Sequence, residues 1–172
     1  MHEIFKVKPD CFASLPSCVG PYVFVGDVWI RSIDVPVKHL ASKKKAILLA
    51  CLAFVHESGY VSWAPVYLKF DGGSKPKASW LFLGHPFGEY LFSYGIHDYE
   101  WGLIWSFFRA GKITARERRK QLKASDRRFR EIHLYIGRHF LNKGIIESVK
   151  NRIKYRGVRV FAGVKGVFVR GK

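Results

Sequence analysis

The chain has few cysteines and no long apolar run. Cys11, Cys18 and Cys51 are too few and too irregularly spaced for a disulfide framework or a zinc site, which is typical of folding in a reducing cytoplasm. The most apolar stretch, residues 46–55, is about half of the roughly twenty residues that span a bilayer. The first residues also lack the pattern of a signal peptide. The sequence therefore predicts neither a transmembrane segment nor a secreted precursor.

Acidic residues are scarce in the last third of the chain. Residues 1–108 carry 10 Lys and Arg against 9 Asp and Glu, whereas residues 109–172 carry 20 against 4. The formal net charge of +17 therefore comes almost entirely from residues 109–172. Unpaired cations repel one another and attract anions, so the candidate partners are nucleic acid, phospholipid head groups and an acidic protein.

The composition is that of a globular protein. Of the 172 residues, 48% are hydrophobic and 16% aromatic, which is enough to bury a full core, and there is no internal repeat or low-complexity segment. We expect an α+β fold with short N-terminal strands, a helix near residues 41–56, two long antiparallel central helices and a basic C-terminal hairpin. The expected domain covers residues 1–140, and residues 141–172 form a basic extension with a short helix and the hairpin.

Two long helices are predicted from apolar spacing. Aromatic and apolar residues recur at steps of three and four from Tyr90 to Phe108, with His97 inside the stripe and Asp98 about 100° around the helix from it. The second helix begins at Thr114, which with Glu117 has the spacing of a capping box. Its apolar positions continue to Phe140.

Asp126 falls on the apolar face of the second helix. An unpaired buried carboxylate is costly, so it needs a cationic or hydrogen-bond donor partner, and His97 is the obvious candidate. Antiparallel packing of the two helices would bring the two side chains together. Such a pair would fix the imidazole tautomer and leave the other ring nitrogen to take a proton from water.

Three ordered motifs carry a resemblance to a known family. They are the stretch 64–76 (APVYLKFDGGSKP), the segment His97-Asp98-Tyr99, and the segment around Ser125-Asp126 and Phe129. The chain resembles a family of small uncharacterised bacteriophage and prophage proteins with D-G-x-S-x-P, H-D-x-x-Y and A-D-x-x-F motifs. It departs from that pattern at Phe70, where the family has Thr. The resemblance implies a virion or accessory protein, located in the bacterial host cytoplasm or the virion, with other phage structural proteins as partners.

The His-Asp and Asp segments are in turn similar to the two catalytic helices of calcium-dependent phospholipase A enzymes. That similarity implies that His97 is the general base, that Asp98 binds calcium and that Asp126 orients the imidazole. Asp71, in a glycine-rich turn, would supply a further oxygen ligand to calcium. The glycine-rich calcium loop of those enzymes is not recognisable here in its usual form.

Each of these features also has a purely structural interpretation. A histidine beside an aspartate on a helix is more often a satisfied core pair than a catalytic dyad. The sequence Asp71-Gly72-Gly73 is by default a turn, because aspartate bonds its own nearby backbone there. His133, on the apolar face of the second helix, is expected to be packing.

The second helix also carries a basic face. Its cations lie mostly off the apolar stripe, and such faces are usually only solvated surface, but here few acidic residues accompany them. The predicted anion-binding residues are Arg116, Arg119, Lys120, Lys123, Arg127 and Arg128. Residues 157–170 alternate apolar and basic positions, which predicts the cationic hairpin.

Three functions remain open at this point. The first is a phage virion or accessory protein that binds anionic partners through its basic C-terminal third. The second is a phospholipase-like calcium-dependent hydrolase, and the third is a nucleic-acid-binding protein without chemistry.

Overall fold

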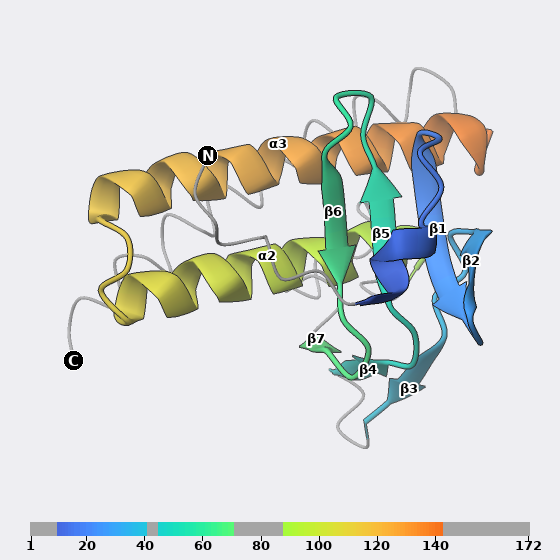
Figure 1. Cartoon of the computed structure of the whole chain (residues 1–172), viewed down its shortest axis with the longest axis horizontal. Coiled ribbons are helices and arrows are strands. Elements are labelled where there is room, and N and C mark those ends of the chain that lie inside the picture. The colour runs from blue at the N-terminus through green and yellow to red at the C-terminus, as the bar shows by residue number, and fades with distance from the viewer. Residues whose placement is uncertain (1–9, 41–44, 71–87, 143–172) are drawn as a thin grey trace, which may run out of the picture.

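The computed structural model describes residues 10–40, 45–70 and 88–142. These residues form two antiparallel sheets and two long helices, so the predicted α+β class is confirmed (Figure 1). The helices lie side by side, and the strands of the larger sheet cross them on one side (Figure 1). The predicted C-terminal hairpin and Asp71 fall outside the described residues.

The larger sheet has the strand order β2-β1-β5-β6. Its strands are β1 (Gly20–Val25), β2 (Val28–Arg31), β5 (Leu52–Val55) and β6 (Val61–Ala64), and every neighbouring pair is antiparallel. The turn between β1 and β2 has two residues, and Gly26 takes its first position with a φ of 61°, where a side chain would be strained. A 3-10 helix, η2 (Asp10–Ser14), precedes this sheet.

The smaller sheet corrects one prediction. It has the order β3-β4-β7, with β3 (Val37–His39), β4 (Ala46–Leu48) and β7 (Lys69–Phe70). The helix predicted near residues 41–56 is therefore wrong, because Ala46–Leu48 form β4 in one sheet and Leu52–Val55 form β5 in the other. All four residues of β5 are buried, and a short, continuously apolar run has no period that separates a buried strand from a buried helix.

The helices begin and end where local signals place them. α2 (Leu91–Arg109) ends in a Schellman motif, in which the amide of Lys112 donates to the carbonyl of Phe107 and Gly111 has a φ of 69°. α3 (Ala115–His139) starts with the predicted capping box: Thr114 Oγ1 accepts from the Glu117 amide, and Glu117 Oε2 accepts from the Thr114 amide. The short loop between them turns α3 antiparallel to α2, as predicted (Figure 1).

The core lies where α2 and α3 meet the two sheets. Phe92, Ile96 and Tyr94 of α2 are buried together with Leu52 and Phe54 of β5. From α3, the residues in this core are Phe129, Ile132 and Ile136. Neither helix is long and apolar enough to cross a bilayer, which is true of all helices in the described part of the chain.

Close packing of α2 on the sheets depends on Gly95. A Cβ atom at Gly95 would lie 3.3 Å from Leu52 Cδ1 and 3.7 Å from Leu48 Cδ1, both of which are in the buried core. At Gly102, in the same helix, no atom of the described residues lies within 4 Å of the corresponding position. Comparing substitutions at the two glycines therefore distinguishes the packing requirement at Gly95 from the general cost of glycine in a helix.

We predict that Gly95→Val lowers the free energy of unfolding by about 1–3 kcal/mol, because the added methyl groups would overpack this contact. Gly102→Val should change it by no more than about 0.5 kcal/mol, because valine and glycine differ little in helix propensity. Urea denaturation of both variants measures the difference. Equal stability of the two variants would contradict this account of the helix–sheet packing.

Candidate functional site

The predicted pair between His97 and Asp126 is present in the structure. His97 Nε2 lies 3.1 Å from Asp126 Oδ1, and Trp101 Nε1 donates to the same oxygen at 3.2 Å. The two side chains come from facing positions on α2 and α3, and they are 7% and 3% exposed. Two donors thus satisfy one buried carboxylate oxygen, as the cost of burying a charge requires.

The surroundings of this pair are aromatic. The His97 ring lies 4.5 Å from the Phe129 ring and 5.4 Å from the Trp101 ring, measured between centroids. His133 is also buried, with its Nδ1 atom 2.7 Å from Ser93 Oγ and its ring stacked on Tyr90 at 4.4 Å. His133 is therefore a packing residue, as expected, and His97 shares a similar environment.

The calcium ligands implied by the phospholipase resemblance do not form a site in the described residues. Asp98 lies on α2 one residue beyond His97 and is half-buried, whereas Asp71 lies outside the described residues. No group of three or more His, Cys, Asp or Glu side chains that could hold a metal ion occurs among residues 10–40, 45–70 and 88–142. The described side chains therefore do not by themselves fit a calcium ion.

A second buried carboxylate, which the sequence reasoning missed, lies one helical turn further along α2. Glu100 is 3% exposed, and the Arg128 guanidinium of α3 donates to it through Nη2 at 2.8 Å and through Nε at 3.1 Å and 3.3 Å. Burial lowers the pKa of Arg128, but the nearby Glu100 carboxylate outweighs this effect and raises the pKa overall. The available signal was a glutamate on the apolar face, three residues after His97.

Glu100 links the helices to the larger sheet. The hydroxyl oxygen of Ser62 in β6 lies 2.9 Å from Glu100 Oε1 and 3.0 Å from His56 Nε2. His56 follows β5 directly, and its Nδ1 atom is 3.1 Å from Glu131 Oε2 of α3. The chain of contacts from Glu131 through His56 and Ser62 to Glu100 therefore joins the sheet to both helices.

This arrangement has the spacing of a serine, histidine and glutamate triad, but it is not built for nucleophilic attack. Ser62 is 1% exposed within a strand, and it is not among the residues that line the neighbouring pocket. A nucleophile must reach its substrate, so the geometry assigns Ser62 a structural role. His56 is likewise held between two partners.

The protonation state of His56 decides where the Ser62 proton points. Burial lowers the pKa of His56, with Arg128 acting in the same direction and the carboxylates of Glu131 and Glu100 opposing it. When His56 is neutral, Nδ1–H donates to Glu131 and Nε2 accepts from the Ser62 hydroxyl. When His56 is protonated, Nε2–H donates to Ser62, and the hydroxyl turns to Glu100.

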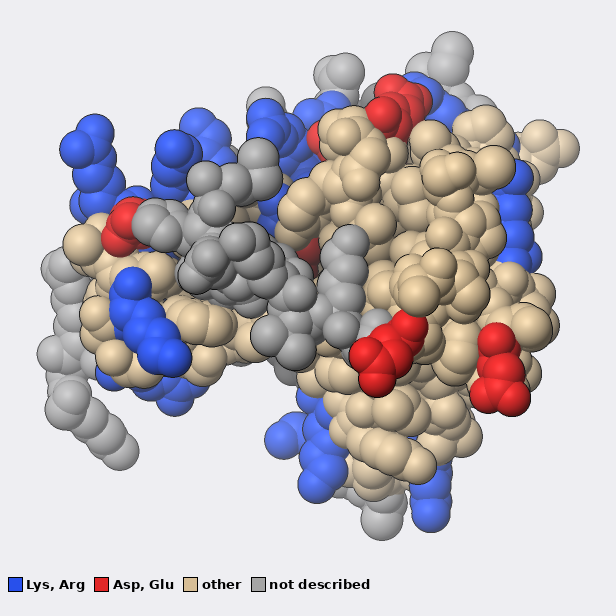
Figure 2. All heavy atoms as spheres, viewed as in Figure 1, with Lys and Arg blue, Asp and Glu red and all other residues tan. Residues whose placement is uncertain are grey.

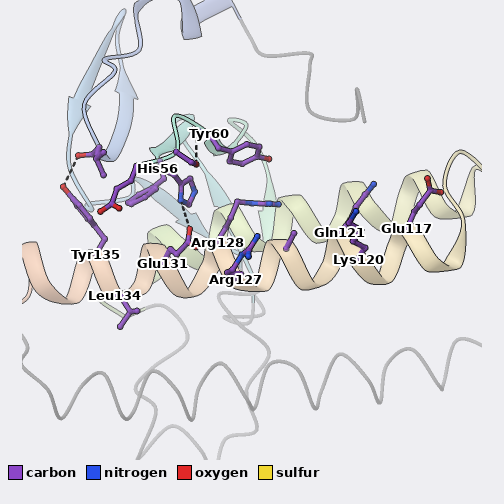
Figure 3. A pocket seen from close by; sticks show the side chains of 15 residues that line it. His56, Tyr60, Glu117, Lys120, Gln121, Arg127, Arg128, Glu131, Leu134 and Tyr135 are labelled. Atoms are coloured by element: carbon purple, nitrogen blue, oxygen red, sulfur yellow. Dashed lines mark hydrogen bonds and ion pairs between the residues drawn. The ribbon is translucent and has the colours of Figure 1, made fainter. Parts of the chain in front are cut away.

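A pocket opens beside this network. It has a volume of about 960 Å³ and lies between one side of α3 and the turn that joins β5 to β6 (Figure 3). His56, Tyr60, Arg128 and Glu131 line one end, while Lys120 and Gln121 line the other (Figure 3). The Tyr60 ring packs on the Arg128 guanidinium at 4.7 Å, and burial together with Glu100 raises the pKa of Tyr60 to about 12.

The outer face of α3 carries a line of cations. Their spacing of three and four residues puts them on one side of the helix, opposite the buried residues Phe129, Ile132 and Ile136. We call this line the basic row, and it consists of Arg116, Arg119, Lys120, Lys123 and Arg127. Figure 2 shows Lys and Arg side chains projecting along the α3 edge of the molecule. All five are exposed, and no ion pair to any of them occurs within the described residues.

Arg128 differs from the other predicted anion-binding residues. It is half-buried, and its guanidinium is bonded to Glu100, so it lies inside the pocket wall and not in the basic row. Arg118 is also turned inward, with its guanidinium over the rings of Trp105 and Phe108 at 4.4 Å and 4.1 Å. The remaining five predicted residues make up the basic row.

Comparison of this chain with family models, with curated proteins and with solved structures gives no match.

The His56 network predicts a dependence of stability on pH. The pKa of His56 is lower in the folded protein than its ordinary value of 6.5, so on acidification the unfolded chain takes up this proton first. The stability that neutral His56 contributes is present above pH 6.5 and is lost as the pH falls. We predict that the stability difference between the wild type and His56→Gln is larger at about pH 8 than at about pH 5.

Denaturant unfolding at several pH values measures this difference. His39→Gln, which removes an exposed histidine of β3, is the matched control and should keep the wild-type pH profile. A difference between wild type and His56→Gln that stays constant with pH would show that the His56 proton is not linked to folding.

Proposed function

We propose that this protein is a phage virion or accessory protein that binds nucleic acid through the basic row of α3. The observation that carries this proposal is the row itself: five exposed cations on one face of one helix, with no carboxylate partner within the described residues. The row from Arg116 to Arg127 is about 16 Å long at 1.5 Å per residue. An array of this length suits a linear polyanion better than a single compact phosphate.

The internal pairing of the α3 carboxylates supports the proposal. α3 contains three acidic residues, and each bonds to a residue outside the basic row: Glu117 in the capping box, the buried Asp126 with His97 and the exposed Glu131 with His56. The positive charge of the outer face is therefore not neutralised within the helix. Cations in this state release counterions when they contact phosphates, which is the main source of affinity in nonspecific nucleic-acid binding.

Nucleic acid is a better partner for this face than a lipid surface. A helix that binds a membrane buries an apolar face among the acyl chains, beside its cationic face. The apolar face of α3 is already covered by α2 and the sheets. On this face of α3, a membrane could therefore contact only the charged row. A phosphate backbone can bind through such cations alone. The resemblance to phage proteins is consistent with a role in which viral nucleic acid is present.

The basic row makes a quantitative prediction. In Arg116→Gln/Arg119→Gln/Lys123→Gln, three phosphate contacts are lost, so the slope of log affinity against log salt concentration should become shallower by about two to three. Affinity for a DNA oligonucleotide at low salt should fall at least about ten-fold. Fluorescence anisotropy across a salt series measures both quantities.

The matched control removes the same charge from the other end of the molecule. Lys38→Gln/Lys45→Gln/Lys69→Gln changes three exposed lysines in or beside the smaller sheet, and it should leave the DNA affinity and the salt slope close to wild type. Equal losses of DNA affinity in the two triple variants would show that the effect comes from net charge and not from the basic row. Loss of binding to anionic vesicles with DNA binding unchanged would replace nucleic acid by lipid as the partner.

A hydrolase is the second candidate function, and the hydrogen bond between His97 Nε2 and Asp126 Oδ1 favours it. This bond holds the imidazole so that its Nδ1 atom is available to a water molecule, as the phospholipase resemblance requires. The pair is also nearly fully buried among aromatic rings, which equally suits a structural role. The described residues do not fit a calcium ion, so the bond between His97 and Asp126 is the structural basis of this candidate.

The hydrolase candidate predicts that the wild type releases fatty acid from mixed phospholipid vesicles and that His97→Gln abolishes the release while keeping its helical circular dichroism. The control is His133→Gln, which alters another buried imidazole between the same helices and should retain the release. Product release is measured with and without added calcium. Absence of release by the wild type under both conditions, or equal release by His97→Gln, would exclude this candidate.

A further inference from the structure

The pocket beside α3 has the size and lining of a ligand site. Its volume of about 960 Å³ lies within the range of roughly 300–1,000 Å³ found for small-molecule sites. The lining combines aromatic and apolar surface, from Tyr60, Tyr135 and Leu134, with a few polar groups (Figure 3). Planar aromatic surface beside hydrogen-bonding groups is the combination that recognises an unstacked nucleobase.

Tyr60 provides the aromatic platform. Its ring is held by the Arg128 guanidinium at 4.7 Å, and Arg128 is in turn fixed by its bonds to Glu100. Because the Arg128 guanidinium packs on the ring and is itself fixed by Glu100, little side-chain entropy remains to be lost when a base stacks on it. The raised pKa of Tyr60, about 12, keeps the hydroxyl protonated near neutral pH, and so it stays a hydrogen-bond donor.

Gln121 provides an independent sign of a missing partner. Its side-chain oxygen is buried and has no hydrogen-bond donor within the described residues. Among the described residues, it is the only buried side-chain atom without a partner that belongs to a residue lining the pocket. A buried acceptor without a donor is costly, so the Gln121 amide would gain a hydrogen bond by turning toward a ligand N–H group in the pocket.

The pocket and the basic row share two residues. Lys120 and Arg127 belong to the row and also line the pocket, whereas Arg116, Arg119 and Lys123 belong to the row alone. A strand whose phosphates follow the row therefore passes the mouth of the pocket. The carboxylates of Glu131 and Glu117 also line the pocket and would repel a phosphate inside it, so the phosphates are expected to stay on the exposed cations Lys120 and Arg127.

We infer that this pocket holds one unstacked base of a single-stranded nucleic acid, with the base against Tyr60 and Gln121 and the adjoining phosphates on Lys120 and Arg127. The inference rests on the proposed nucleic-acid function and makes it specific for single strands. In a duplex, each base is stacked and paired, and extruding it costs a few kcal/mol. A single strand can present an unstacked base without that cost.

The test compares a single-stranded oligonucleotide with the duplex of the same sequence and length, by fluorescence anisotropy at one salt concentration. The wild type should bind the single strand at least about ten-fold more tightly, since one base stacked on an aromatic ring adds about 1–3 kcal/mol. Tyr60→Leu should lose most of this preference. Tyr60→Phe keeps the ring and should retain it.

Two further variants separate the pocket from the row and from the fold. Gln121→Leu alters the pocket without touching the Glu100 and Arg128 pair, and it should weaken single-strand binding while duplex binding stays unchanged. Lys123 lies in the row outside the pocket, so Lys123→Gln should lower the affinity for the single strand and for the duplex equally. Thermal unfolding of each variant shows whether it is folded. If Tyr60→Leu does not fold, the binding of Gln121→Leu alone tests the base pocket.

The outcomes also distinguish this inference from the proposed function. Equal wild-type affinity for the two oligonucleotides, or an unchanged preference in both Tyr60→Leu and Gln121→Leu, would overturn the base pocket and leave binding by the basic row in place. Binding of neither oligonucleotide would overturn both. A single-strand preference that depends on Tyr60 and Gln121 would support both.

Discussion

The pairing of buried carboxylates between α2 and α3 is the constraint on which the rest of the structure depends. Each helix contributes one carboxylate and receives one from its neighbour: Asp126 of α3 accepts from His97 and Trp101, and Glu100 of α2 accepts from Arg128. A buried carboxylate left without a donor costs several kcal/mol, more than a single apolar contact contributes. Sliding one helix by a turn, about 5.4 Å, would break both pairs at once. The two pairs therefore favour a single register of the helices.

The same pairing decides the electrostatics of the surface. Glu117, Asp126 and Glu131 each bond to another residue of the fold, and none of them forms an ion pair with the basic row within the described residues. The buried network and the basic row of α3 thus both follow from the partners that its carboxylates take. A helix whose carboxylates formed ion pairs with its own surface cations would have had neither the buried network nor the basic row.

The contact between the sheet and the helices brings the two candidate binding features together. His56 and Tyr60 lie at the end of β5 and in the turn that follows it, and they reach α3 through Glu131 and Arg128. That junction forms one wall of the pocket, and the basic row runs past its other end (Figure 3). Loops and strand ends that meet a rigid helix are a common place for binding groups, because they hold side chains without filling the space between them.

The sequence by itself determined the local parts of this protein. Apolar spacing and the Thr114 capping box gave both helices, and the position of Asp126 on an apolar face was enough to predict its bond to His97. Tertiary structure alone decided that residues 46–55 form strands in two sheets, and that His56, Ser62, Glu100, Arg128 and Glu131 meet. The physical reason is the range of the interactions. Periods and caps involve neighbours within one helical turn, whereas His56 and Glu131 are separated by 75 positions in the chain, and only the packing of the sheet on the helices brings them together.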